Sequence, residues 1–279
     1  MAYQLADLLR LMEQLRDPDY GCPWDRKQDL ASIVPHTLDE VYEVIDTIER
    51  LDYPHLQDEL GDLLFQVVFY ARICAEAGQF EFGDVIDGLV TKLLRRHPHV
   101  YPNGGFDSFG GEVQLSEEQI KLSWERIKAE ERAGKVTAES DKAAPSVLDD
   151  ISGAMPALLR AHKLQKRAAY IGFDWQSLAP VLDNLDGEIL ELRQAIASAD
   201  RAGIADEMGD VLFSCVNLAR HLKQDSEQLL RQSNTKFEQR FRRVEVLAEQ
   251  QGLVMADTEE QVLDRLWQQA KAELTSSAS

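Results

Sequence analysis

The stretch LQDELGDLLFQVVFYA, residues 56–71, decides the fold. Its apolar residues recur at intervals of three and four, which is the pattern of a helix that buries one face. Val41, Val44, Ile45 and Ile48 form a similar stripe just upstream. No segment alternates apolar and polar residues with the period of two that is typical of a strand. The sequence therefore predicts an all-α protein.

This part of the chain occurs twice. An offset of 148 residues aligns Glu40–Arg72 with Glu188–Arg220 without a gap, and 13 of the 33 aligned positions are identical. Chance alone gives about two identities at typical residue frequencies. We therefore expect a tandem duplication of one helical bundle, with a first copy in an N-terminal domain (1–132), a small and polar linker (133–150) and a second copy in a C-terminal domain (151–279).

The two copies share acidic residues as well as apolar ones. Each copy has Glu-x-x-Glu on one expected helix and Glu-x-x-Asp on the next. Residues three apart lie on one helix face, so antiparallel packing of the two helices would bring four carboxylates together. Such a group needs cations, and oxygen ligands suit Mg²⁺ or Mn²⁺. The candidate metal ligands are Glu40, Glu43, Glu59 and Asp62 in the first copy and Glu188, Glu191, Glu207 and Asp210 in the second.

A solvated helix face and a di-iron bundle are less favoured roles for these acids. A single acidic pair is common on a solvated helix face, but matched pairs at the same spacing in both copies are not. A di-iron bundle uses Glu-x-x-His on two helices, and no histidine of this chain follows a glutamate at that spacing. Gly61 and Gly209 each cost a helix about 1 kcal/mol relative to alanine, which predicts a close backbone approach at these positions.

Composition excludes several classes of protein. The chain has 279 residues, is 44% hydrophobic and carries a formal net charge of −19. This charge disfavours binding to nucleic-acid phosphates but is compatible with a polyphosphate held through divalent cations. Three scattered cysteines fit a reducing cytoplasm, and no apolar stretch reaches the roughly 18 residues of a membrane span. We expect a cytoplasmic protein without nucleic-acid or membrane partners.

With these motifs the chain resembles the MazG family of nucleoside triphosphate pyrophosphohydrolases, within the all-α NTP pyrophosphatase superfamily. The segments GCPWD (21–25) and RRHPHVY (95–101) add to the resemblance. The resemblance implies a homodimer that hydrolyses NTPs and dNTPs to the monophosphate and pyrophosphate with Mg²⁺, in nucleotide-pool house-cleaning. It also implies that the acids of each copy are metal ligands, and that the catalytic residues are Glu188, Glu191, Glu207 and Asp210.

The resemblance extends to phosphate-binding residues. Asn234, Lys236 and Arg240 in NTKFEQRF look like the family's NxKFxxRF segment, whose cations are placed for phosphates. The first copy keeps both cations as Lys92 and Arg96, but it has valine where the asparagine stands. The alternative for these cations is an ordinary solvated helix face. The complete segment favours the second copy as the source of most activity.

Two further residues resemble nucleotide contacts of the family. Trp267 is similar to a C-terminal tryptophan that contacts nucleotide, although it could equally anchor the last helix. Lys128 resembles a linker lysine that reaches the second-copy site. Some residues count against a strong second site. Just ahead of the first acidic motif and before the second, the family often has charged residues where this chain has Asn184, Gly187 and Ile204.

Two other functions stay open at the level of sequence. The chain could be a nucleotide-binding regulatory module with little turnover, or its helices could serve dimerisation alone. The sequence contains no GxSxG, GxxxxGK[ST] or GxGxxG motif, which disfavours serine-hydrolase, P-loop and Rossmann chemistry. Hydrolysis by metal-activated water is therefore the leading hypothesis.

Overall fold

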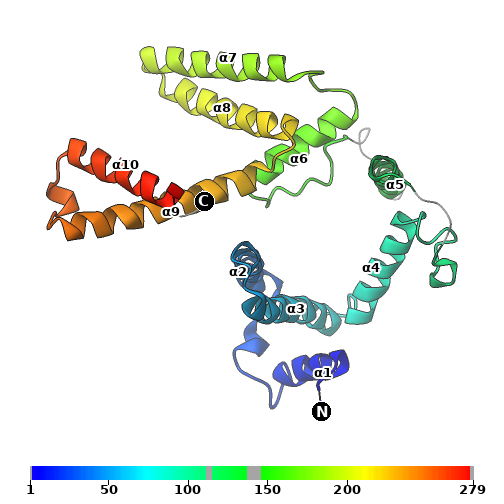
Figure 1. Cartoon of the computed structure of the whole chain (residues 1–279). Helices are drawn as coiled ribbons and strands as arrows, with labels where there is room; N and C mark the ends of the chain where they lie inside the picture. The colour runs from blue at the N-terminus through cyan, green and yellow to red at the C-terminus, as the bar shows by residue number, and fades with distance from the viewer. Residues whose placement is uncertain (1, 111–114, 137–145, 277–279) are drawn as a thin grey trace. The chain divides into compact units, whose positions relative to one another are not determined.

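A computed structural model describes residues 2–110, 115–136 and 146–276 (Figure 1). Every regular element in these ranges is helical, which confirms the predicted all-α class. The chain divides into two compact units, Met1–Ser140 and Asp141–Ser279, and each unit is described by itself. Among the described helices, none contains an apolar stretch of the length that a membrane span requires.

The first unit is built on a helical hairpin of α2 and α3 (Figure 1). Asp29 caps the start of α2, where its Oδ1 accepts a hydrogen bond from Ser32 N at 2.8 Å, and Asp52 caps α3. Helix α1 packs against α3 and closes a core of Met12, Ile33, Val68 and Phe69. The helices are α1 (Leu5–Leu15), α2 (Leu30–Glu49), α3 (Tyr53–Glu76), α4 (Phe82–Arg96) and α5 (Glu117–Val136).

The second unit repeats the hairpin as α7 and α8, which run side by side in Figure 1. The repeat extends to the turn: Leu51 and Ala199, which are 148 positions apart, both have positive φ, at 57° and 53°. The next residue, Asp52 or Asp200, caps the second helix of its hairpin. The helices are α6 (Ala157–Tyr170), α7 (Leu178–Ala197), α8 (Arg201–His221), α9 (Ser226–Gln250) and α10 (Glu260–Ser276).

Two expectations differ from the structure in detail. Helix α5 continues to Val136, so the first four residues of the expected linker are helical, and residues 137–145 lie outside the described ranges. The domain borders stay a prediction. The close approach expected at Gly61 and Gly209 is wrong for the single chain, because a Cβ at either position meets no atom within 4 Å. Both glycines lie on the exposed side of their helices.

Candidate functional site

In the first copy the α2–α3 hairpin brings three carboxylates together. One oxygen each from Glu40, Glu43 and Glu59 lies within 4.8 Å of the others. Asp62 is outside this set, although its charge helps to raise the pKa of Glu40, whose first cause is burial. The full convergence of four acids is therefore not found. A helix turns 100° per residue, so two acids three apart point about 60° away from each other.

The α7–α8 hairpin gathers a different set of three in the second copy. Here the oxygens of Glu188, Glu207 and Asp210 lie within 4.8 Å of one another, and Glu191 lies outside. Burial raises the pKa of Glu207, and the negative charges of Glu191 and Asp210 raise it further. Both copies thus place three carboxylates at metal-ligand spacing, with the fourth acid close enough to act electrostatically.

An amide supports one carboxylate in each copy, but it comes from opposite helices. In the first copy Gln66 on α3 donates from Nε2 to Glu40 Oε1 at 3.5 Å. In the second copy Asn184 on α7 donates from Nδ2 to Glu188 Oε1 at 3.3 Å and to Ser214 Oγ at 2.9 Å. Position 214 is the counterpart of position 66, so the second copy has replaced the amide on one helix by an amide on the other.

The donor atoms fit a hard divalent cation. All the gathered side-chain atoms are carboxylate oxygens, which is the ligand chemistry of Mg²⁺ and Mn²⁺. Glu207 Oε2 is buried and has no hydrogen-bond partner among the described residues, and buried polar atoms are normally paired. In the first copy the pKa of Glu59 is raised by burial and then by Glu43. Among the described residues, the groups that shift the pKa values of Glu59 and Glu207 include no positive charge, and a cation would supply one.

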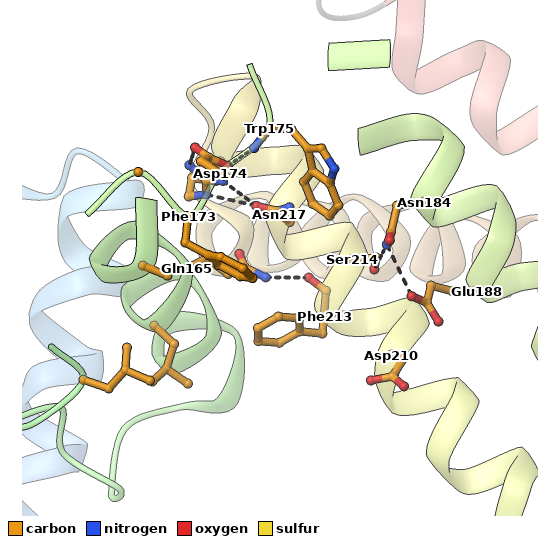
Figure 2. A pocket seen from close by; sticks show the side chains of 15 residues that line it. Gln165, Phe173, Asp174, Trp175, Asn184, Glu188, Asp210, Phe213, Ser214 and Asn217 are labelled. Atoms are coloured by element: carbon orange, nitrogen blue, oxygen red, sulfur yellow. Dashed lines mark hydrogen bonds and ion pairs between the residues drawn. The ribbon is translucent and has the colours of Figure 1, made fainter. Parts of the chain in front are cut away.

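A cavity of about 670 Å³ opens beside the acids of the second copy (Figure 2). Its volume lies within the range of about 300–1,000 Å³ typical of small-molecule sites. Glu188 and Asp210 lie toward one end, and the aromatic side chains Phe173, Trp175 and Phe213 line the remainder. The corresponding hollow of the first copy holds only about 240 Å³ and is lined by Trp24, Ile33, His36, Glu40, Asp62, Phe65, Gln66 and Phe69.

The expected phosphate-binding segment of the second copy lies on α9. Lys236 and Arg240 are one helical turn apart, Asn234 precedes them, and none of the three lines the cavity. Asn234 and Lys236 are exposed, whereas Arg240 is half-buried. The structure thus leaves these side chains available but does not bring them to the acids. Their roles stay predictions.

Three of the four remaining expected contacts have partners of their own. Trp267 on α10 packs against the α9–α10 core, with its ring centroid 5.4 Å from that of Phe237. Arg96 on α4 is paired with Glu131 of α5, Nη2 to Oε2 at 2.5 Å, and Lys128 is paired with Glu125 at 3.1 Å. The half-buried Lys92 lies on α4 as well. The anchoring alternative for Trp267 agrees with its packing, and substrate contacts of all four residues stay predictions.

Much of the cavity wall lies outside the sequence motifs. Gln165, Phe173, Trp175 and Asn217 belong to no acidic or basic motif. One signal was present in the offset of 148, which aligns Asn217 with the fully buried Phe69. A polar residue in place of a core aromatic, inside an otherwise similar helix, indicates a change from packing to binding.

Comparison with known proteins identifies both copies. A family model described as the MazG nucleotide pyrophosphohydrolase domain matches residues 28–101 and 176–244. A nucleoside triphosphate pyrophosphohydrolase of Escherichia coli K12 is 46% identical over 272 residues, covering 96% of this chain and 97% of the relative. A protein of Thermotoga maritima named nucleoside triphosphate pyrophosphohydrolase/pyrophosphatase MazG is 39% identical over 265 residues, covering 95% and 94%.

Proposed function

The chain belongs to the MazG nucleotide pyrophosphohydrolase family, and from this premise we propose that it hydrolyses nucleoside triphosphates to the monophosphate and pyrophosphate with Mg²⁺. The observation that carries the proposal is the convergence of three carboxylates from two helices in each copy. Relatives that cover nearly the whole chain are named for this activity. The substrates are NTPs and dNTPs, and the role is the clearance of nucleotides from the pool.

In this proposal the acids bind the metal ion, and the basic residues on α9 bind the phosphates. Mg²⁺ bound by the acids would lower the pKa of the attacking water and offset the charge of the polyphosphate. Asn184 orients Glu188 by donating a hydrogen bond to its Oε1. Lys236 and Arg240 on α9 supply cations for the phosphates. Mn²⁺ suits the same oxygen ligands.

The second copy provides most of the activity in this proposal. Its cavity is large enough for a nucleotide, whereas the first copy has a hollow of about 240 Å³. Its segment on α9 keeps the asparagine that the first copy lacks. Arg96, the first-copy counterpart of Arg240, is already paired with Glu131. These three differences all favour the second copy.

Release of pyrophosphate from a mixture of NTPs and dNTPs tests the activity. We expect release with Mg²⁺ or Mn²⁺ and none after chelation. A protein that binds nucleotides with Mg²⁺ but releases no pyrophosphate would instead be a regulatory module. A protein whose stability and nucleotide binding are both indifferent to Mg²⁺ would support the purely structural alternative.

We also propose that the chain forms a homodimer. Apolar side chains on the hairpin helices are exposed in the single chain, including Val41 on α2, Leu60 and Leu64 on α3 and Leu212 on α8. Exposed apolar surface of this extent is typical of an interaction face. Sedimentation velocity should show a dimer at micromolar concentration, and a monomer alone would contradict the proposal.

A further inference from the structure

The wall of the second-copy cavity contains two buried side-chain amides. The neighbours of each amide fix which of its two polar atoms is left without a hydrogen-bond partner among the described residues. Asn217 and Gln165 are only 7% and 8% exposed, and both line the cavity (Figure 2). Neither belongs to the acids or to the segment on α9. Buried side-chain amides need partners for the oxygen and for the nitrogen, so the atoms left without one indicate what a ligand must supply.

The orientation of Asn217 follows from its contact with Arg220. Asn217 Oδ1 accepts hydrogen bonds from Arg220 Nε at 3.0 Å and Nη2 at 2.6 Å. A guanidinium has only donors, so the oxygen of the amide must face it and the NH₂ group must face away. Among the described residues no acceptor is found for Nδ2. Asn217 therefore offers the cavity a hydrogen-bond donor.

Arg220 is itself held in place. Its guanidinium pairs with Asp174 through Nη1 to Oδ2 at 2.8 Å and Nη2 to Oδ1 at 2.5 Å. Two parallel hydrogen bonds of this kind fix the plane of the guanidinium. Asp174 precedes Trp175 in the segment that lines the cavity. The ion pair thus connects the aromatic wall to the amide of Asn217.

Within the described part of the chain, Gln165 leaves the opposite kind of atom unpaired, an acceptor where Asn217 leaves a donor. Its Nε2 donates to the backbone oxygen of Phe213 at 2.9 Å, and a carbonyl can only accept, so the amide oxygen must point away from α8. Oε1 is buried without a partner among the described residues. Gln165 therefore carries an unpaired acceptor in the wall of the cavity where Asn217 offers a donor.

We propose that this cavity is a nucleobase pocket in which Asn217 donates to the base and Gln165 accepts from it, with Asp174 and Arg220 as positioning residues. The proposal rests on the proposed function and names the residues with which that site holds the base of its substrate. A planar base suits the aromatic walls Phe173, Trp175 and Phe213, and the hydrogen-bonding edge of every base carries both a donor and an acceptor. Glu188 and Asp210 stand at the end where the triphosphate belongs.

The first copy shows how the pocket is lost. Phe69 stands at the position of Asn217 and is fully buried in the core with Met12, Ile33 and Val68. The counterpart of Arg220 is Arg72, which pairs with Glu76 instead of an asparagine. The first copy thus keeps the acids but has no amide at the position of Asn217. Gln165, Phe173 and Trp175 also precede the matched family segment 176–244, so this chain supplies part of the pocket from outside it.

Binding experiments test the pocket independently of turnover. The probes are α,β-methylene analogues of ATP, GTP, CTP and UTP, and inorganic tripolyphosphate as a ligand without a base, each with Mg²⁺ and measured by calorimetry. The central variant is Asn217→Asp, because it keeps the size and the contact with Arg220 but replaces the donor by an acceptor. Gln165→Leu removes the acceptor. Gln224→Glu adds a similar charge in the exposed turn that follows α8 and is the control.

We expect Asn217→Asp and Gln165→Leu to weaken the best-bound analogue about 10- to 100-fold, the effect of one unpaired buried group, and to change the order of the four bases. Tripolyphosphate should bind each variant within about twofold of the unmodified chain, and the control should bind every ligand normally. Asp174→Asn should narrow the spread of affinities among the bases while leaving tripolyphosphate unchanged.

Equal weakening of all four analogues and of tripolyphosphate, or no weakening at all, would overturn the nucleobase pocket. Failure of the proposed function gives a different result. In that case the unmodified chain binds the analogues with base preference but releases no pyrophosphate from the natural NTPs.

Discussion

The two hairpins have the same backbone features and acidic motifs but differ in the side chains around the acids. α2–α3 and α7–α8 share the acidic motifs, the turn residue with positive φ and the aspartate that caps the second helix. They differ in the amide that holds the first carboxylate, which is Gln66 on the second helix in one copy and Asn184 on the first helix in the other. The comparison shows that a duplicated helix pair can exchange the source of a supporting hydrogen bond and still keep its acids in place.

The larger difference lies at one position of the second helix, beyond the acids. Phe69 fills the core of the first unit, whereas Asn217 faces a cavity in the second. One amide in place of an aromatic side chain thus accompanies the change from a hollow of about 240 Å³ to a cavity of about 670 Å³. The acids alone do not make two equivalent sites.

The largest effect is expected from removing acids in one copy at a time. Glu188→Gln with Glu191→Gln should lower kcat/KM for pyrophosphate release by at least about 10³-fold, because both changes remove charge from the metal site but keep the side-chain size. Glu40→Gln with Glu43→Gln should lower it less than about tenfold, because we propose that the second copy carries most of the activity. A greater loss from the first-copy pair would reverse the assignment of the active copy. Single changes Glu188→Gln or Asp210→Asn should leave the fold intact, as measured by circular dichroism.

Truncation at the aligned position should separate core from pocket. Phe69→Ala should cost about 3–5 kcal/mol of unfolding free energy, because it leaves a cavity in a packed core. Asn217→Ala should cost about 1 kcal/mol, because it removes hydrogen bonds to Arg220. Urea unfolding, with hydrogen exchange as the probe in each unit, measures the loss of unfolding free energy for both variants. Similar costs at the two positions would show that Asn217 is a packing residue.

The free energy of unfolding of the metal-free protein should depend on pH through the acidic groups. Burial raises the pKa values of Glu40 and Glu207, so the folded state binds more protons than the unfolded state. This contribution is complete below about pH 4.5 and is lost as the pH rises through the raised values. In the opposite direction, hydrogen bonds from Arg220 lower the pKa of Asp174 to about 2, so its contribution is lost as the pH falls from about 4 to 2.

Mg²⁺ should restore, at neutral pH, the stability that is lost when Glu40 and Glu207 ionise. At about 10 to 100 times its Kd, a ligand of the folded state adds about 1–3 kcal/mol, and urea unfolding at about pH 5 and pH 8 with and without Mg²⁺ measures the difference. Glu207→Gln should make the metal-free protein less sensitive to the rise in pH and should weaken the response to Mg²⁺. An unchanged pH profile would show that the acids of the second copy do not repel one another.

The smallest effect is expected from the supporting amides. Asn184→Leu should weaken Mg²⁺ binding to the second copy about 3- to 10-fold, because one hydrogen bond to a charged group is lost. Gln66→Leu should affect the first copy less, because its bond to Glu40 is longer, at 3.5 Å against 3.3 Å. Calorimetric titration of each variant, in a chain whose other copy carries the paired Gln changes, separates the two sites. Equal weakening of Mg²⁺ binding by the two variants would show that the two amides support their carboxylates equally.

Much of the fold could be predicted because its signals are local. The three-and-four spacing of apolar residues predicts helices, and the offset of 148 predicts that the same hairpin forms twice. Motif spacing also placed Glu188 and Glu207 on facing helices, since the residues between the two acidic motifs suffice for the end of one helix, a turn and the start of another. These features depend on periodicity and distance along the chain, which the sequence states directly.

The cavity and the composition of the carboxylate sets were decided only by the tertiary structure. Which three of four acids approach one another depends on the rotation of one helix against the other, and a motif does not specify that rotation. Gln165 on α6 meets Phe213 on α8 across 48 positions, and Asp174 meets Arg220 across 46. Such contacts arise when apolar burial packs α6 against the hairpin, so no local pattern indicates them. The sequence by itself determined the helices, the duplication and the acids, while packing between helices decided which copy has the larger cavity.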